Sequence, residues 1–457
     1  MILGPGGMPW EEGNAYLARL AKAKKAAGTV DQYASVIRVY AEYCTEMQRD
    51  PAHMTFDSLE AYRQHRIDEG DLGAETWNAS LAPLKGLYNR IRSGPGIVLR
   101  PITDEDWRDL RLSGDRVSMP RFVEPDDYVR FRLTGLQARD LRTGRLTVAS
   151  YALRSPVRNA LYADCLLTHG MRRAEAGYLT LLDLPRRREG YAWNSGSLSA
   201  KICKGSVSRP WREQRSWVRR LAIYQDTEWT TTVEQLQPTL RRLRKQGDLL
   251  VVTDVDDRFG TPRLVLEGPR RTRALGKLSR EQRRRLVCTP EVAARMGSET
   301  GMGARGFTHV TAKEFIVPLA VFPGTRTAML TPAAWGLTFR EANARVKAAV
   351  RATDPLASAP GRVTPHMLRH TFATRFLDER LTEMAKEDRE FAEAYANGDF
   401  ARLRKRFFNP LLDLQKLLGH ASLDTTLRYL KYLTERQPAV HMPGDSWTES
   451  YLNDIPA

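Results

Sequence analysis

The stretch from Thr364 to Tyr432 constrains the fold of this 457-residue chain more than any other part of it. Two groups of residues in this stretch combine helix signals with titratable side chains. The first group is the run TPHMLRHTFAT at 364–374, and the second is LLGH at 417–420, with Tyr429 nine positions after the histidine. Polar residues of several kinds at fixed places between apolar ones make both groups candidate site segments.

The first group predicts a helix that begins at Thr364. Threonine is a good N-cap, and Pro365 suits the first helical position. His366 and Arg369 are three residues apart, so both side chains project from one side of the first turn. Apolar residues then recur every four positions and predict one buried face: Leu368, Phe372 and Phe376.

The second group predicts a buried, leucine-rich helix over 411–418 that ends at Gly419, where glycine accepts a left-handed cap. His420 then lies in a tight turn. The next helix carries a leucine stripe at positions 423, 427 and 430. At 100° per residue Tyr429 lies on the flank of that stripe, whereas Tyr432 lies nearly opposite it. We therefore expect Tyr429 to reach a groove and to be the better nucleophile.

Two further motifs precede these groups. Residues 170–175 read G-M-R-R-A-E, a glycine turn between two apolar segments, and Lys204-Gly205 marks a turn between strand-like segments. Taken in order, G-x-R-x-x-E, K-G, H-x-L-R-H and L-G-H-x9-Y resemble the signature of tyrosine recombinases, the phage-integrase family. The resemblance covers most of residues 29–432 outside two insertions. It implies a mainly α fold with a small antiparallel β-sheet (α+β).

The resemblance also implies a set of catalytic residues and their roles. Two arginines bind the non-bridging phosphate oxygens, a lysine protonates the leaving 5′ oxygen, one histidine accepts the tyrosine proton, and the other donates to the phosphate. In that order of roles, the matching residues are Arg172 and Arg369, Lys204, His366, His420 and the nucleophile Tyr429.

Neighbouring residues of the same types are given lesser roles. Glu175, one helical turn from Arg172, is expected to orient that arginine. Lys201 is the alternative to Lys204. His370 and His169 are expected to be structural, because a histidine in a helix–helix seam is usually a satisfied core residue.

Charge and cysteine content point to a nucleic acid partner inside a reducing compartment. The formal net charge is +17, which favours a polyanion such as DNA. Cys44, Cys165, Cys203 and Cys288 have no metal-ligand spacing, so no metal site, cofactor or disulfide framework is expected. No signal peptide and no run of 18 apolar residues is present, so we expect a cytoplasmic, nucleoid-associated protein without membrane spans.

Helical periodicity and turn signals predict the domain organisation. Apolar periods begin at Thr29, at Thr55 and at Trp77, the last with a kink at Pro83, and predict a small helical domain that resembles the family's DNA clamp. Strands are expected at 191–193, 198–203 and 207–217. The expected parts are an N-terminal arm (1–27), the helical core-binding domain (28–95), a linker (96–150), the catalytic domain (151–435) and a tail (436–457).

The catalytic domain is expected to contain two insertions. The first, near 225–310, is rich in arginine and has no motif, so extra DNA contact and a mobile surface loop deserve similar weight. The second, near 380–409, has the charge density of an exposed helix. The resemblance implies that the tail docks on a neighbouring protomer.

These observations predict a site-specific recombinase that cuts and rejoins double-stranded DNA through a 3′-phosphotyrosyl link and a Holliday junction. Four copies on two paired sites, in a phage or other mobile element, are the family expectation. Two alternatives stay open: a type IB topoisomerase-like relaxing enzyme and a non-cleaving DNA-binding protein on the same fold. A metal nuclease fits poorly, because no Asp/Glu cluster accompanies the histidines.

Overall fold

The fold is that of a computed structural model of the chain. It describes residues 1–4, 7–23, 25, 27–68, 74–94, 101–112, 121–147, 153–185, 193–256, 262–268, 271–300, 315–356, 358, 360–387, 393, 395–399 and 408–436. The chain divides into two compact units, Met1–Ser118 and Met119–Ala457. The division falls inside the range 96–150 that was expected to be a linker.

The first unit is helical and has its own aromatic core. Tyr43 and Tyr62 lie 4.9 Å apart between ring centroids, and Tyr62 and Trp77 lie 5.8 Å apart. The Trp77 indole donates to the Leu110 carbonyl at 2.7 Å, which attaches the last helix to the core. The helices expected from periodicity are present. The elements are α1 (Glu11–Lys22), α2 (Ala27–Glu46), α3 (Phe56–Asp68), α4 (Ala74–Arg92) and α5 (Asp104–Asp109).

Part of the expected N-terminal arm is a helix packed in this core. Tyr16 on α1 is 7% exposed, and α1 packs on α2 and α4. Its hydroxyl occupies the space in which a side chain at Gly86 would lie, 1.9 Å from an added Cβ. Glycine at 86 therefore lets α1 approach α4 closely.

The second unit is built around α7 (Pro156–His169), whose residues from 158 to 169 are all buried. A helix buried on every side needs partners all round it. Here α14, α9 and η2 pack against it. The helices of this unit outside the insertions are α6 (Pro125–Arg130), η2 (Phe131–Leu136), α8 (Arg173–Gly177), η4 (Leu181–Asp183), α9 (Arg215–Tyr224), α13 (Pro332–Thr353), α14 (Pro365–Glu387), α17 (Phe408–Leu418) and α18 (Leu423–Arg436).

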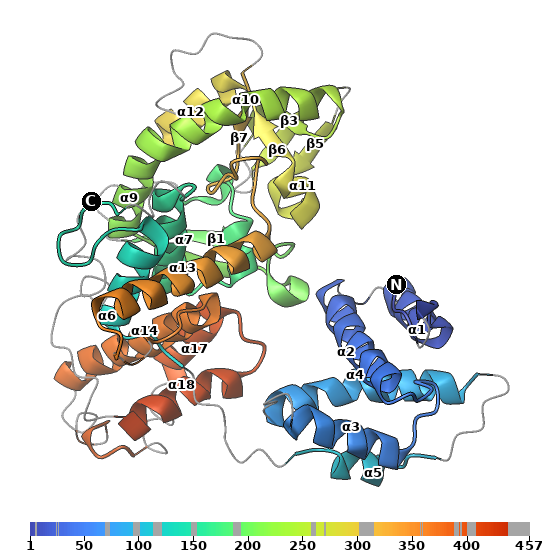
Figure 1. Ribbon diagram of the computed structural model, residues 1–457. Helices are drawn as coiled ribbons and strands as arrows, with labels where there is room; N and C mark the ends of the chain where they lie inside the picture. The colour runs from blue at the N-terminus through green and yellow to red at the C-terminus, as the bar shows by residue number, and fades with distance from the viewer. Residues whose placement is uncertain are drawn as a thin grey trace. The chain divides into compact units, whose positions relative to one another are not determined.

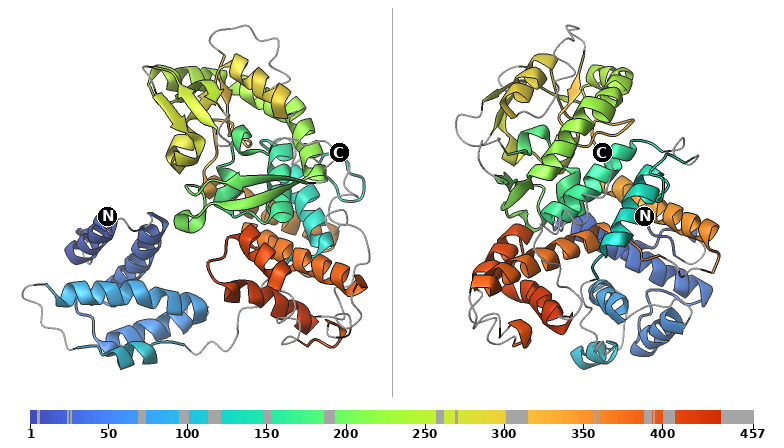
Figure 2. Two further views of the ribbon diagram at one scale, coloured as in Figure 1. Left: turned by 180° about the vertical axis from the view of Figure 1, so that it is seen from behind. Right: turned by 90° about the vertical axis from the view of Figure 1, so that its left-hand side faces the viewer.

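The two predicted site segments form one packed group. Helix α14 contacts both α17 and α18, and these two contact each other. Figures 1 and 2 show the three helices, in orange and red, lying together from every side. Helix α14 begins at Pro365 and α17 ends at Leu418, as the capping signals predict. Gly419 has a φ of 63°, the left-handed conformation expected of this cap.

The expected small sheet is present but shorter than predicted. Strands β1 (Trp193–Leu198) and β2 (Arg209–Gln214) pair antiparallel. Strand β1 runs through 194–196, the gap between two of the expected strands. Gly196 packs against Pro185 and the Trp211 indole, so a side chain there would clash. Residues 199–203 form turns rather than a strand, and η5 (Lys204–Ser206) follows them.

The first insertion contains a second sheet that no sequence signal indicated. Its strand order is β5-β4-β3-β6-β7, with β3 and β6 parallel and the other pairs antiparallel. The fold class, mainly α with small sheets, is confirmed. The elements of this region are η6 (Gln225–Trp229), α10 (Thr230–Lys245), β3 (Leu250–Asp256), β4 (Arg263–Leu266), β5 (Arg271–Ala274), η7 (Leu275–Lys277), α11 (Arg280–Arg284), β6 (Leu286–Cys288), α12 (Pro290–Thr300) and, just beyond the expected range, β7 (Val317–Pro318).

Residues 388–392, 394 and 400–407 of the second insertion, and residues 437–457 of the tail, lie outside the described residues. Helix α14 continues into the second insertion as far as Glu387. Within the parts of the chain that the structure describes, no helix is both long enough and apolar enough to cross a membrane.

Candidate active site

Glu175 gathers three arginines from three separate elements. Its carboxylate accepts from the Arg172 guanidinium at 2.8 Å and from Arg209 at 2.6 Å, and Arg369 lies 3.9 Å away. The Arg172 backbone N–H also donates to Glu175, at 2.8 Å, so the carboxylate orients both ends of that residue. Burial alone raises the pKa of Glu175, but the charges of Arg209, Arg369 and Arg172 outweigh it and lower that pKa to about 2. Glu175 is therefore ionised at neutral pH.

The same three arginines satisfy the carbonyls at the end of α17. Arg209 donates to the Leu417 carbonyl and Arg369 to the Leu418 carbonyl, while Arg172 donates to the Gly419 carbonyl at 3.3 Å. The last carbonyls of a helix lack intrahelical donors and carry the negative end of its dipole. The carbonyls at the end of α17 thus offset part of the positive charge of the three arginines that Glu175 does not balance.

The pKa of Arg369 is strongly lowered in this cluster. It is 3% exposed, and its other donor contact is the Gly170 carbonyl at 2.6 Å. Burial and then the neighbouring charges of Arg172 and Arg209 lower its pKa to about 9. The cluster therefore holds more positive charge than its own carboxylate can balance, which is the electrostatic condition for binding an anion.

The Tyr429 hydroxyl points at a histidine beside this cluster. Its oxygen lies 2.7 Å from Nδ1 of His370, and Tyr429 is 3% exposed. Burial raises the pKa of Tyr429, whereas the charges of Arg369 and Arg172 act to lower it. Both arginines are therefore close enough for their charge to reach the phenol.

His370 was expected to be structural, and its place in the site is a finding of the structure. Burial, followed by the charges of His366 and Arg369, lowers its pKa to about 3. At neutral pH the ring is therefore uncharged, and with its proton on Nε2 it can accept a hydrogen bond from the Tyr429 hydroxyl. His366, expected to accept this proton, instead packs its ring on His370 with 4.1 Å between ring centroids.

His420 is the second histidine beside Tyr429. The two rings are nearly parallel, at 7° with 6.1 Å between centroids, and His420 Nδ1 lies 3.0 Å from the Thr426 hydroxyl. Burial, then the charges of Arg369 and Arg172, lower the pKa of His420 to about 3. A neutral imidazole with one nitrogen held by Thr426 leaves the other nitrogen for the site.

Lys204 lies on the exposed turn η5 between β1 and β2. Gly205 and Ser206 have φ angles of 77° and 55°, so the turn is tight. The lysine side chain makes no hydrogen bond or ion pair with any residue that the structure describes. Its charge is nevertheless among those that lower the pKa of His366, after burial, Arg369 and Arg172. No such effect on a site residue is found for Lys201 within the same described part of the chain.

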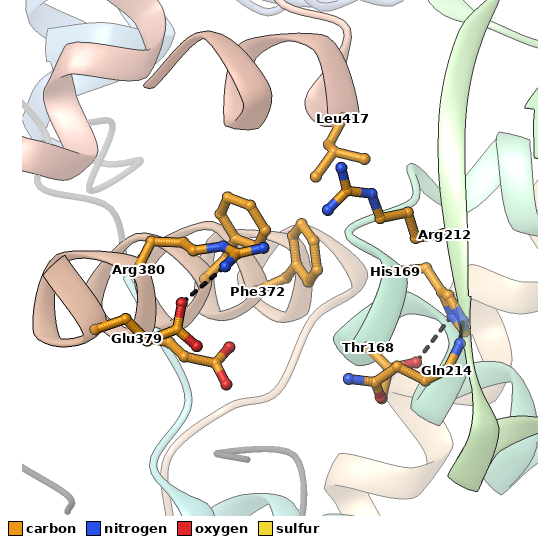
Figure 3. A pocket seen from close by; sticks show the side chains of 10 residues that line it. Thr168, His169, Arg212, Gln214, Phe372, Glu379, Arg380 and Leu417 are labelled. Carbon is orange, nitrogen blue, oxygen red and sulfur yellow. Dashed lines mark hydrogen bonds and ion pairs between the residues drawn. The ribbon is translucent and has the colours of Figure 1, made fainter. Parts of the chain in front are cut away.

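His169 is a core residue, as expected, and it borders a separate pocket. Its ring lies between Trp211 and Trp217, with centroids 5.3 Å and 5.0 Å away, and burial lowers its pKa to about 4. Figure 3 shows His169 and Gln214 on one wall of this pocket and side chains of α14, such as Arg380, on the opposite wall. None of the expected catalytic residues lines it.

The helical wheel distinguished the two tyrosines of α18 by their expected exposure, and the structure does not. Tyr429 is 3% exposed rather than open to a groove, and Tyr432, opposite the leucine stripe, is 4% exposed, with its ring 5.8 Å from that of Phe122. The segment before α6 covers that face of α18, so both tyrosines are buried. Contact with His370, rather than exposure, distinguishes Tyr429.

Arg209 is a second site residue that sequence reasoning missed. It is 3% exposed on β2, in alternation with Trp211 and Glu213, which are each 1% exposed. An arginine in phase with a buried tryptophan on a strand is the signal that would have found it. Its neighbour in space, Gly419, has no room for a side chain, because an added Cβ would lie 2.8 Å from Cδ of Arg209.

Within the described residues, no group of three or more His, Cys, Asp or Glu side chains is arranged to hold a metal ion.

Comparison with known proteins gives likeness in structure only. No protein-family model and no curated protein sequence matches the chain. The structure is similar to XerH site-specific recombinase bound to difH substrate, with 15% identity, a TM-score of 0.42, and coverage of 94% of this chain and 84% of that one. For the Tn1549 transposon integrase in complex with circular intermediate DNA the values are 13%, 0.42, 92% and 94%. For XerA recombinase they are 14%, 0.28, 98% and 100%. Likeness at this level is too weak to assign a function.

Proposed function

We propose that this chain is a site-specific tyrosine recombinase that cuts and rejoins DNA strands. The observation that carries the proposal is the 2.7 Å contact between the Tyr429 hydroxyl and His370, beside the arginines held by Glu175. A phenol with a neutral proton acceptor, next to an excess of guanidinium groups, is the arrangement that phosphoryl transfer to a tyrosine needs.

In the proposed reaction the Tyr429 oxygen bonds to phosphorus while the bond from phosphorus to the 5′ oxygen breaks. The phenol proton passes to His370, which the observed contact favours over His366. Lys204 gives a proton to the departing 5′ oxygen. The product is a 3′-phosphotyrosyl link and a free 5′ hydroxyl. Attack by the 5′ hydroxyl of another strand reverses the step and joins the strands.

The arginines have separate tasks in this scheme. Arg172 and Arg369 supply planar, paired donors to the non-bridging oxygens, a geometry that lysine does not offer. Arg172 is the more open of the two, with its side chain 26% exposed. Arg209 stays on Glu175 and the end of α17 and holds the other two in place. His420 donates to the phosphate.

The partner in this proposal is double-stranded DNA carrying a recombination site, attracted by the net charge of +17. We propose four copies on two paired sites, a Holliday-junction intermediate, exchange of the 436–457 tails between copies, and a role in integrating or excising a mobile element. The scheme uses only side chains of the chain and calls for neither a metal ion nor ATP. The setting is the cytoplasm of a prokaryotic host, on its nucleoid.

Covalent trapping tests the proposal. The protein is incubated in EDTA with supercoiled DNA from the neighbourhood of its own gene, and protein–DNA adducts are resolved on a denaturing gel. We expect an adduct with the wild type and with Tyr432→Phe, and none with Tyr429→Phe. Tyr432→Phe is the matched control, because it removes the other buried hydroxyl of α18.

Each outcome has a distinct meaning. An adduct lost only in Tyr432→Phe would identify Tyr432 as the nucleophile. No adduct with the wild type would favour a DNA-binding protein that does not cleave. An adduct together with relaxation, but without exchange between two sites, would favour a topoisomerase-like enzyme.

A further inference from the structure

The structure assigns a function to the first insertion: we propose that its helix α11 and the turn η7 before it position Lys204, with Arg280 as the positioning residue. This inference rests on the proposed function, in which Lys204 is the acid for the leaving 5′ oxygen. Helix α11 connects β5 to β6 in the five-stranded sheet (Figure 1).

The turn that carries Lys204 has few contacts of its own. Residues 204–208 are all exposed, and two of them have positive φ angles. Because the lysine side chain has no partner among the described residues, its position depends on the backbone just before it. A group that must be within hydrogen-bond reach of its target needs such support.

The insertion holds that backbone at two places. Arg280 donates to the Ile202 carbonyl at 3.0 Å and to the Cys203 carbonyl at 3.5 Å, the two residues directly before Lys204. The Ser199 hydroxyl donates to the Gly276 carbonyl of η7 at 2.9 Å. Ile202 and Cys203 are 0% and 4% exposed and pack in the same core as Leu275 and Leu278 of the insertion.

Arg280 also reaches the segment after Arg172. Its guanidinium lies 5.8 Å from the ring centroid of Tyr178, which caps α8, the helix that begins directly after Arg172. The Arg280 side chain thus contacts both the backbone just before Lys204 and the C-terminal end of α8, the helix that follows Arg172. The distance between these two catalytic positions is set partly by a residue outside both motifs.

Helix α11 is firmly attached to the rest of the second unit. Arg283 on α11 is 1% exposed and pairs with Asp183 at 2.6 Å, and it also donates to the Leu275 carbonyl at 3.3 Å. Ser279 and Gln282 form a capping box at the start of α11, with hydrogen bonds of 2.9 Å and 3.2 Å. The buried ion pair and the helix cap therefore hold the backbone of Arg280 in place.

The test compares two leaving groups. The DNA site at which the wild type becomes attached is synthesised as a nicked suicide duplex, once with the normal 5′ oxygen and once with sulfur in that bridging position. A thiolate leaves without a proton, so the sulfur substrate does not need the acid. We expect Arg280→Ala to slow single-turnover cleavage of the oxygen substrate by about 10- to 100-fold and that of the sulfur substrate by less than about twofold.

Controls separate positioning from folding and DNA binding. Lys204→Ala should give the same pattern with a larger loss, and Ser199→Ala a smaller one. Arg284→Ala is the matched control, because Arg284 lies on the same helix and pairs with the exposed Glu281 at 3.0 Å. It should cleave both substrates at the wild-type rate.

Other results would overturn the inference. Equal slowing of both substrates by Arg280→Ala would mean that Arg280 binds DNA or only stabilises the fold, and no slowing would mean that the insertion does not position the lysine. Absence of wild-type cleavage of either substrate would overturn the proposed function, and this inference with it.

Discussion

Two buried carboxylates of the second unit, Glu175 and Asp164, are both surrounded by arginines and lie near a tyrosine, yet their surroundings differ. Asp164 binds Arg132 at 2.9 Å and Arg220 at 3.4 Å, and the Tyr128 hydroxyl donates to it at 2.6 Å. Burial lowers the pKa of Arg132, but Asp164 outweighs burial and raises it. At Glu175 the corresponding arginine, Arg369, has its pKa lowered.

The difference lies in the balance of charge and in what the tyrosine faces. Asp164 has one fully buried arginine and a second at its edge, whereas Glu175 has two buried arginines and a third at its edge. The tyrosine at Asp164 donates to the carboxylate, while Tyr429 faces a neutral histidine. Asp164 therefore faces one arginine in excess and Glu175 faces two, so the cluster at Glu175 has the larger uncompensated positive charge and is the better site for an anion.

The largest expected effect concerns the acceptor that each tyrosine faces. His370→Ala should slow adduct formation by about 100-fold or more, because a positioned base contributes roughly 10²- to 10⁴-fold. Tyr128→Phe, which removes the phenol hydroxyl at Asp164, should leave the chemical step unchanged. Single-turnover trapping at saturating protein measures both.

The same assay with His366→Ala decides between the two histidines. A loss smaller than that of His370→Ala agrees with the observed contact. Full activity of His370→Ala together with loss of activity in His366→Ala would identify His366 as the base. The contact between His370 and Tyr429 would then be present only in the absence of DNA.

Neutralising each carboxylate is the next test. Glu175→Gln and Asp164→Asn should each lower the free energy of unfolding by roughly 3–5 kcal/mol, because both leave buried arginines without a counter-charge. Sulfate should restore more of the loss in Glu175→Gln than in Asp164→Asn, since the cluster at Glu175 has the larger excess of arginine. Urea unfolding in sulfate and in chloride at equal ionic strength measures this.

Asp164→Asn also reports the general stabilising effect of sulfate on folded proteins. Equal recovery in both variants would therefore contradict a specific anion site at Glu175.

The smallest expected effect is a change in acid stability. The pKa of Glu175 is lowered from 4.5 to about 2 in the folded chain. A carboxyl with a depressed folded pKa stabilises the fold above its unfolded pKa and loses that contribution as the pH falls toward its folded pKa. Between pH 4.5 and pH 3 the stability advantage of the wild type over Glu175→Gln should narrow by about 1.5 kcal/mol. A constant advantage across this range would contradict the depressed pKa.

The helices could be predicted from the sequence where strong local signals agree with tertiary packing. Thr364-Pro365 and Gly419 mark helix ends in the structure as they do in the sequence. The five-stranded sheet could not be predicted in the same way. Its strands are short, β6 has three residues, and β3 pairs in parallel with β6 across more than thirty intervening positions. Pairing over such a separation leaves no local pattern.

The candidate site was predictable to the extent that its residues belong to motifs. The structure brings Arg172, Glu175, Arg369, His420 and Tyr429 into one cluster. Arg209 and His370 were missed because their roles depend on contacts between elements. A helical wheel gives the face of a residue, but it cannot show that Phe122 covers Tyr432 or that His370 meets Tyr429.

The hydrogen bonds from three arginines to three consecutive carbonyls, 417–419, have a thermodynamic consequence. A guanidinium group that turns its donors toward a phosphate has fewer to give to these carbonyls, so the two acceptors compete. Binding of a phosphate and the position of the segment from 417 to 429 are then thermodynamically linked. A phosphate changes the equilibrium between positions of this segment by the same free energy by which the position changes the affinity for phosphate. In the proposed function, the DNA strand would thereby take part in releasing Tyr429.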